Sequence, residues 1–580
     1  MSLRRALLGA LLLASACDGG AARPPNDPQG QALDRLRAFE QHERLKTDFA
    51  ALPSWDEVRG ADPYAIEPLG DGAVGILRGS SAVVLFDADG RAIARASAPR
   101  SPTGLAVRGE EIFVASEYAP RIARYRATGD RLEALEAIDL GDALGVRDVA
   151  VGPEGVIYAV EELSDRLLVR GIDSALSHEE RVCAGPVAVE RAASHLVINC
   201  LIDRTLVIRS VDEQGLPLAD AVRITHDGPI WSFAARVGST ERAQPERVSQ
   251  GELLLAIGGV EDRPLDRTVG FFGYIDSFVS LYRVSEGRAS RVAAVNVAER
   301  GVVTPKALVW LENKNLFVTG YGGEHAVELD DSGRVVATSK LPPGTNDAVS
   351  LKDGMLLANP MLDAWVTLPH SVSTRSGKPT RGGEAVLTRV SQGPEPSADR
   401  DEIRLGEMLF FTNLMAPDNP SDGAHSRFSC ETCHFEGYVD GRTHHTGRGD
   451  IRATTKPLYG LFNNKPHFTR ALDRDLTVVA HAEFRVAGQG NGHDPWFELA
   501  VEPRPWLEPL AGGRERIDPE SLRKALMRFL MAFTHRPNPR VIGRDHFDDR
   551  ESAGARAFRE RCASCHAPRL SADDPASAVP

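Results

Sequence analysis

The sequence predicts a multidomain chain in which an all-β propeller, with seven blades, is followed by a mainly α-helical domain. Three observations predict this: a β-type unit that recurs along residues 50–375, amphipathic helical patterns after residue 400, and a Gly and Pro content that favours turns. At 580 residues the chain is too long for one hydrophobic core. Its net charge of −13, without a dense Lys/Arg stripe, argues against nucleic acid as a partner.

Residues 1–16 have the pattern of a bacterial export signal. Two Arg residues precede an apolar run, and the small residues of LASAC lead into Cys17. This pattern predicts a lipoprotein signal peptide with lipidation of Cys17, and residues 17–49 as a tether and lead-in. The alternative is a plain secretory signal in which Cys17 is incidental. The predicted location is the periplasm or cell surface, with the membrane contacted through a lipid anchor only.

The β-type unit consists of two apolar runs separated by a polar Gly turn. Its copies begin at Pro63, Pro102, Val146, Gly185, Gly228, Thr304 and Asn346. Most starts are roughly 40 to 45 residues apart, which is the period of a four-stranded propeller blade. The pattern resembles the YVTN and quinoprotein-type propellers and implies a docking platform. A β-sandwich or a six-bladed ring is the alternative fold for this region. After it, residues 376–400 are expected to form a linker, because they are rich in Pro, Gly and Ser.

Each of the seven cysteines can be assigned a role. Cys17 is assigned to lipid and four others belong to two CxxCH motifs, which leaves Cys183 and Cys200. These two bracket about one β-hairpin, so a disulfide between them is one interpretation and two buried thiols are the other.

The two motifs read CETCH at 430–434 and CASCH at 562–566. Covalent haem c accounts for every position, because the two thiols form thioethers to the haem and the adjacent His binds the iron. A four-cysteine zinc site leaves both His residues unexplained, and a redox dithiol needs a βαβ setting. The sequence therefore predicts two covalently attached haems c. The predicted haem-binding residues are Cys430, Cys433, His434, Cys562, Cys565 and His566, with His434 and His566 as iron ligands.

Helical patterns accompany the motifs. Residues 521–535 carry a stripe of large apolar side chains, and residues 552–562 form an amphipathic pattern that leads into the second motif, with Ser552 as a candidate cap.

Three segments around the first motif occur in an ordered set: RLGEMLFF (404–411), SCETCHFEGYVDGRTHH (429–445) and RATTKPLYGLFNNKPHFTRALDRDL (452–476). The set resembles the bacterial di-haem cytochrome c peroxidases and their methylamine-utilisation relatives, over about residues 400–566. The resemblance implies a di-haem cytochrome c domain at 401–580, in which the first haem is the reactive one and the second relays electrons.

The resemblance also implies distal groups. His445, or its neighbour His444, matches a loop His that caps the first iron, and Glu483 corresponds to a distal carboxylate that acts as acid/base on peroxide. Family members bind Ca²⁺ between the haems, so Ca²⁺ is a further expected cofactor. The sequence does not identify which residues would bind it. The family's distal Gln has no match here. Family members also continue well past the second motif, so the domain is expected to be incomplete at its C-terminus.

The sequence thus predicts an exported di-haem cytochrome that transfers electrons, with peroxide reduction or protein oxidation as its enzymatic form. The expected partners are an electron-donor protein or a protein substrate that docks on the propeller, with peroxide as the small-molecule substrate. The alternative is a non-enzymatic electron carrier or surface binding protein whose two haems are both six-coordinate.

Overall fold

A computed structural model describes residues 28–46, 58–173, 175–237, 252–261, 275–370, 380–390, 398–415, 427–445, 452–463, 465–471, 473–480, 497–534, 547–562 and 564. The chain divides into two compact units, Met1–Asp48 and Phe49–Pro580. The predicted signal peptide and Cys17 lie outside the described residues. Among the helices that are described, none is both long and apolar enough to cross a membrane.

The first unit differs from the tether predicted for residues 17–49, because Pro28–Lys46 forms helix α2. Its first residue is a proline, which fits the first turn of a helix, and most of the following residues are strong helix formers. The Pro- and Gly-rich composition that predicts a tether therefore extends only to the start of this helix.

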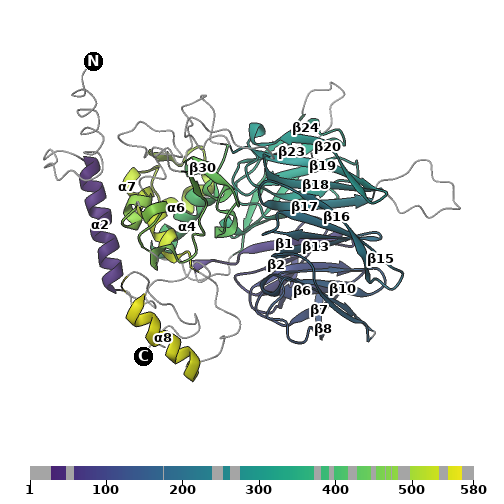
Figure 1. The fold of residues 1–580 in the computed structure, drawn as a ribbon. Helices are drawn as coiled ribbons and strands as arrows, with labels where there is room; N and C mark the ends of the chain where they lie inside the picture. Colours follow the sequence, from purple (N-terminus) through teal and green to yellow (C-terminus); the bar gives the residue numbers. More distant parts are fainter. Residues whose placement is uncertain are drawn as a thin grey trace, which may run out of the picture. The chain divides into compact units, whose positions relative to one another are not determined.

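The second unit contains seven antiparallel sheets that form a seven-bladed β-propeller, as the repeat predicts (Figure 1). Blade 1 contains β1 (Pro63–Leu69), β2 (Gly72–Leu77), β3 (Ala82–Phe86) and β4 (Ala92–Ser97). Blade 2 contains β5 (Pro102–Arg108), β6 (Glu111–Ser116), β7 (Arg121–Thr128) and β8 (Arg131–Asp139). Blade 3 contains β9 (Asp148–Val151), β10 (Val156–Glu161), β11 (Arg166–Gly171) and β12 (Ser177–Arg181).

Blade 4 contains β13 (Pro186–Ala192), β14 (His195–Cys200), β15 (Thr205–Val211) and β16 (Pro217–Thr225). Blade 5 contains β17 (Ile230–Val237), β18 (Leu253–Val260), β19 (Ser277–Ser285) and β20 (Arg288–Asn296). Blade 6 contains β21 (Pro305–Trp310), β22 (Leu316–Gly320), β23 (His325–Leu329), β24 (Val335–Lys340) and the added strand β28 (Thr380–Arg381). Blade 7 contains β25 (Asp347–Leu351), β26 (Gly354–Asn359), β27 (Ala364–Pro369) and β29 (Val386–Arg389). Short 3₁₀ turns follow three of the blade strands at η1 (Glu162–Ser164), η2 (Ala298–Arg300) and η3 (Pro360–Leu362).

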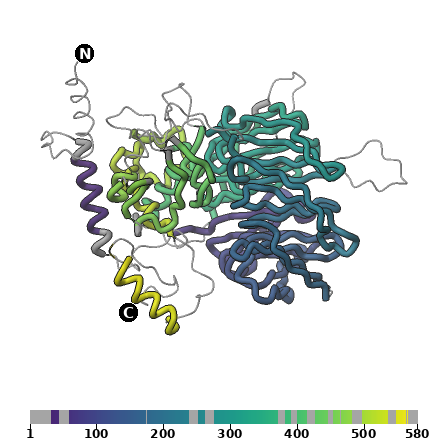
Figure 2. The backbone as a smooth tube through the Cα atoms, in the orientation of Figure 1, coloured from purple at the N-terminus to yellow at the C-terminus, as the bar shows by residue number. Residues whose placement is uncertain are grey.

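The backbone passes through the blades in sequence order (Figure 2). The first strand of each blade packs against the first strand of the next, so these strands surround the centre of the ring. Among the described strands, blades 1 and 7 do not exchange a strand to close the ring. Instead, the backbone N–H of Ile66 in blade 1 donates to Asp347 of blade 7 at 2.9 Å, and Asn346 donates to the Tyr64 carbonyl at 2.8 Å.

The propeller extends further along the chain than the predicted boundary at residue 375. Strand β29, which lies in the segment expected to be a linker, pairs antiparallel with β27 and completes blade 7. Strand β28 pairs parallel with β24 at the edge of blade 6. The physical reason is that an unpaired outer edge leaves backbone hydrogen-bonding groups without partners, and these two strands cover two such edges.

A recurring turn explains how the outer strands of several blades are joined. In blade 1, the Asp87 carboxylate accepts hydrogen bonds from the backbone N–H groups of Asp89 and Arg91, and Gly90 takes a positive φ of 74° that favours glycine. The same Asp-x-x-Gly turn, with the same two backbone hydrogen bonds, follows the third strand in blades 4 and 6.

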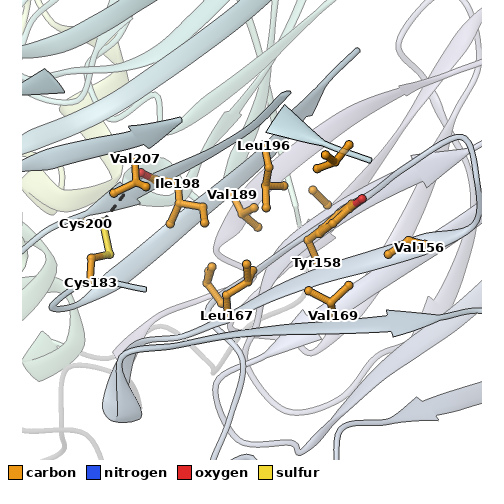
Figure 3. Packing of buried hydrophobic residues seen from close by; sticks show 13 residues of the cluster. Val156, Tyr158, Leu167, Val169, Cys183, Val189, Leu196, Ile198, Cys200 and Val207 are labelled. Carbon is orange, nitrogen blue, oxygen red and sulfur yellow. Dashed lines mark hydrogen bonds between the residues drawn. A yellow bond between two sulfur atoms is a disulfide. The ribbon is translucent and has the colours of Figure 1, made fainter. Parts of the chain in front are cut away.

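The core lies between neighbouring blades. Between blades 3 and 4, Tyr158 and Leu167 pack against Leu196 and Ile198 in one buried cluster (Figure 3). The same cluster contains the disulfide Cys183–Cys200, which ties the segment before β13 to the end of β14. Each fully buried large apolar side chain contributes about 1.5–3 kcal/mol to folding.

Among the described residues after the propeller are the helices α4 (Ala398–Phe411), α6 (Glu508–Ala511), α7 (Pro519–Ala532) and α8 (Asp549–Arg561), and residues 476–480 are also helical. Between them lie short elements: η4 (Asn413–Met415), η5 (Cys430–Thr432), η6 (Phe435–Gly437), β30 (Thr443–His445), β31 (Arg452–Thr454), η7 (Leu461–Asn463), η8 (Thr469–Ala471), β32 (Leu499–Ala500), η9 (Pro505–Leu507) and β33 (Arg516–Ile517).

Helices α4 and α7 pack closely; α7 corresponds to the helical pattern at 521–535, and α4 contains the RLGEMLFF segment. Gly406 makes the close approach possible, because a Cβ there would lie 2.1 Å from the carbonyl oxygen of Ala525. Phe410 of α4 and Phe529 of α7 pack with ring centroids 5.3 Å apart. Helix α8 begins earlier than expected: Asp548, not Ser552, caps it, and Glu551 completes a capping box.

Candidate functional site

The first CxxCH motif forms a single 3₁₀ turn. Ser429 precedes η5, and its backbone N–H donates to the Thr432 hydroxyl at 3.0 Å. The Cys433 N–H donates to the Cys430 carbonyl at 3.2 Å. Because residues three apart eclipse one another in a 3₁₀ helix, the turn brings the two cysteine side chains to the same side. Both cysteines are partly exposed.

His434 follows this turn in the form that binds a metal. Its Nδ1–H donates to the carbonyl oxygen of Lys456 at 2.9 Å, which leaves the lone pair on Nε2. Burial lowers the pKa of His434 to about 4, against the opposing influence of Asp440. The imidazole is therefore neutral at ordinary pH. A neutral ring that donates its other N–H to a backbone carbonyl is the usual arrangement of a histidine ligand.

A second polar group lies beside Cys433. Asp440 and His444 are buried and joined by a hydrogen bond of 2.6 Å between Oδ2 and Nε2. Burial alone would raise the pKa of Asp440, but the hydrogen bond and charge of His444 lower it. Donor atoms of Cys433, Asp440 and His444 lie within 4.8 Å of one another, and no other described group of three such side chains does so.

The propeller holds the first motif through charged side chains. Glu431, between the two cysteines, is fully buried and forms an ion pair of 2.7 Å with Lys306 of β21. Burial raises the pKa of Glu431, and Lys306 opposes that rise. Glu436, just after the motif, pairs with Arg147 at 2.6 Å, and Arg147 also bonds Glu117.

Apolar and backbone contacts complete this attachment. Phe435 packs in a buried cluster with Leu201, Trp231, Val260 and Ile275, and its ring centroid lies 6.3 Å from that of Trp231. Arg442 donates to the Asp227 carbonyl at 3.2 Å and to the Glu261 carbonyl at 2.5 Å. Blades 3 to 6 thus all contribute to the surface on which the motif lies.

The predicted site residues fall into three groups. The structure brings Cys430, Cys433 and His434 together, and it places His444, the predicted alternative to His445, beside Cys433. The backbone of His445 lies in β30, but its side chain is outside the described residues, as are Cys565, His566 and Glu483. Of the second motif only Cys562 and Ser564 are described, and Cys562 directly follows α8.

Sequence reasoning missed the residues that fix the motif to the propeller. Glu431 is one of two variable positions between the cysteines. Lys306, in β21, and Arg147, directly before β9, are single basic residues far away in sequence. The pairing between them depends on tertiary structure. The one available signal is that both basic residues lie at the start of an innermost strand, where a blade meets the central axis.

No protein-family model and no curated protein matches the chain. Among solved structures, the hydrazine synthase of Kuenenia stuttgartiensis is 12% identical with a TM-score of 0.40, over 57% of this chain and 97% of that chain. A streptogramin B lyase is 12% identical with a TM-score of 0.39, over 52% and 92%. Virginiamycin B lyase from Staphylococcus aureus is 13% identical with a TM-score of 0.35, over 53% and 94%. We base no conclusion on these likenesses, since the seven sheets themselves show the propeller.

Proposed function

We propose that the chain is an exported di-haem c-type cytochrome that transfers electrons. The first haem would be attached to Cys430 and Cys433 with His434 as iron ligand, and the second to Cys562 and Cys565 with His566. The observation that carries the proposal is the His434 imidazole, neutral and oriented through Nδ1–H toward the Lys456 carbonyl, directly after a turn that aligns two thiols.

Each residue of the first motif has a defined task in this proposal. The haem, when bound, supplies an iron that changes oxidation state by one electron. The two thiols hold the group covalently, and the Lys456 carbonyl keeps the imidazole in one tautomer. The ion pair of Glu431 with Lys306 fixes the turn to the propeller.

The remaining parts of the chain complete the proposed function. The propeller would act as a docking platform for an electron-donor protein or a protein substrate. A lipid on Cys17 would anchor the protein in the periplasm or at the cell surface. Calcium between the haems remains a prediction from the family resemblance.

A haem assay on the full-length protein, produced in a host that attaches haem c, tests the proposal. We expect a pyridine haemochrome spectrum of the c type and two haems per chain, retained after denaturation. Absence of covalent haem would contradict it. One bound zinc per chain, lost in a Cys433→Ser variant, would instead assign the Cys433, Asp440 and His444 group as a metal site.

The enzymatic form of the proposal is peroxide reduction at the first haem, with Glu483 and His445 as the candidate distal groups. Its rival is a carrier with two six-coordinate haems. A high-spin ferric band that disappears rapidly on addition of hydrogen peroxide supports the enzyme. Two low-spin haems that do not react with peroxide support the carrier.

A further inference from the structure

The centre of the propeller contains a cavity of about 650 Å³, which is the size of a small-molecule site. It is surrounded by the innermost strands of the blades, and Phe435 and Glu436, just after the first motif, also line it. The ionisable side chains that line the cavity are Tyr64, Glu67, Arg147, Asp148, Glu190, Arg191, Lys306, Asp347 and Glu436.

Every basic side chain of this lining already has a carboxylate partner. Arg147 pairs with Glu436 and Glu117, Arg191 pairs with Glu154 at 3.4 Å, and Lys306 pairs with Glu431 at 2.7 Å. Four carboxyl groups of the lining form no ion pair with a described side chain, although the charge of Arg147 partly opposes the raised pKa of Asp148: Glu67, Asp148, Glu190 and Asp347. They come from blades 1, 3, 4 and 7, so they face the cavity from different sides.

Three of these carboxyl groups accept a backbone hydrogen bond from the next blade. Asp148 accepts from Val189 at 2.9 Å, Glu190 from Ala235 at 3.1 Å, and Asp347 from Ile66 at 2.9 Å. Such bonds explain why these residues are present at blade junctions, but each uses only part of a carboxylate's acceptor capacity. Glu67 accepts no hydrogen bond from any described residue.

Asn199 supplies an independent indication of a ligand. Its side chain lines the cavity and is 2% exposed, and its Nδ2 donates to the Ile230 carbonyl at 3.0 Å. Its Oδ1, although buried, has no hydrogen-bond donor among the described residues. A buried acceptor without a donor costs about 1–3 kcal/mol, so a ligand that donates an N–H to this atom would recover that energy.

The electrostatics of the four carboxyl groups favour a positively charged occupant. Burial raises the pKa of Asp148 and Asp347 to about 7 and that of Glu190 to about 8. Burial, together with repulsion from the other three carboxyl groups, raises the pKa of Glu67 well above its usual value. A cation in the cavity would stabilise the ionised forms.

We propose that the central cavity is a binding site for a small organic cation with ammonium groups, held by Glu67, Asp148, Glu190 and Asp347, with Asn199 as a further acceptor. An amine fits better than an inner-sphere metal ion. The described residues bring three metal-donor atoms within 4.8 Å only at Cys433, Asp440 and His444, outside this set. No three of the four carboxylates therefore lie close enough to ligate one ion together, whereas a diamine spans several ångströms. The aromatic side chains of Trp231, Phe233 and Phe435 in the lining suit the methylene groups and the charge of such a ligand.

Calorimetric titration of the full-length protein with 1,4-diaminobutane tests the proposal. We expect one molecule to bind per chain at pH 8.5, and about tenfold more weakly at pH 6, because binding must displace protons from the carboxyl groups. At pH 7 the heat should differ between buffers of different ionisation enthalpy, which shows proton release. Binding without proton release, or no binding at millimolar diamine, would overturn the proposal.

Variants locate the site. Glu67→Gln should weaken diamine binding about tenfold or more, the expected loss of one charge-assisted hydrogen bond. Asp71→Asn removes an exposed carboxylate from the β1–β2 turn of the same blade. This variant should bind the diamine with an affinity within about twofold of that of the unaltered protein. Equal effects of the two variants would contradict the proposal. If Glu67→Gln does not fold, the pH and buffer dependence of the unaltered protein still decides.

Two further probes identify the class of ligand. Butyrate, which has a similar length and the opposite charge, should not bind. Calcium that binds at micromolar concentration and displaces the diamine would show a metal site and overturn the proposal. Haem content is measured on the same sample, and the inference does not depend on it, since the four carboxylates belong to the propeller.

Discussion

The two CxxCH motifs have the same spacing but different surroundings. The first is built into the face of the propeller, where Glu431 and Glu436 pair with Lys306 and Arg147. The second follows α8, in which no residue is buried. The first motif is therefore connected to the propeller by fully or largely buried ion pairs, whereas the helix that leads into the second motif contributes no buried side chain.

This difference shows how a short motif can be made rigid. A CxxCH sequence provides the attachment chemistry, but only the variable positions and the residues after the His can connect it to a scaffold. In the first motif these positions carry Glu, Phe and Glu, all of which contact the propeller. At the corresponding positions the second motif carries Ala563, Ala567 and Pro568, which offer no comparable charge or large apolar surface.

The largest effect is expected from removal of the attachment cysteines. The double variant Cys430→Ala, Cys433→Ala should lose one of two haems and also lower the stability of the propeller by about 1 kcal/mol or more, because the turn packs on it. The variant Cys562→Ala, Cys565→Ala should lose one haem without that second effect. Haem content and urea unfolding followed by tryptophan fluorescence measure the two quantities. Equal losses of propeller stability would contradict the comparison.

A charge deletion probes the attachment itself. Lys306→Met leaves Glu431 buried without its cation, so the free energy of unfolding should fall by about 3–5 kcal/mol. The double variant Lys306→Met, Glu431→Gln removes both charges and should recover most of that loss. Lys340→Met, at an exposed position at the end of β24, is the control and should change stability by less than about 0.5 kcal/mol. Failure of the double variant to recover stability would show that packing, not charge, is lost.

The pH dependence of unfolding tests the carboxyl groups at the centre of the propeller. The pKa values of Asp148, Glu190 and Asp347 are raised by burial to about 7, 8 and 7. Groups whose folded pKa is raised contribute stability that is complete below the unfolded pKa, about 4, and is lost as the pH rises through the folded pKa. The melting temperature of the propeller should therefore fall between pH 6 and pH 9. Asp148→Asn should reduce this dependence and Asp71→Asn should not.

The fold could be predicted from sequence because its signals are local and repeated. All seven predicted repeats coincide with innermost strands, from Pro63 in β1 to Asn346 just before β25. The end of the propeller could not be predicted in the same way. Strands β28 and β29 lie after a Pro-, Gly- and Ser-rich stretch and are recruited by edges of blades that were formed earlier in the chain.

The candidate site also has a part that the sequence predicts and a part that depends on the tertiary structure. The motif residues are adjacent in sequence, and their chemistry can be recognised from spacing alone. The partners of Glu431 and Glu436 lie 125 or more residues away, and their pairing arises only from the closed ring. The cap of α8 was predicted at Ser552 because Ser is a favoured cap, but Asp548 with Glu551 gives a reciprocal capping box that extends the helix by one turn.

The smallest effect is expected at this cap. Asp548→Ala removes the acceptor of the Glu551 N–H, a hydrogen bond of 2.8 Å, and should destabilise α8 by about 1 kcal/mol. Because α8 has no buried residue, the midpoint of propeller unfolding should not change. Hydrogen exchange across residues 549–561 would measure the local loss, and Ser552→Ala, which removes no capping bond, is the matched control. A fall in propeller stability in the Asp548 variant would show that α8 is energetically connected to the ring, and the contrast between the two motifs would then be wrong.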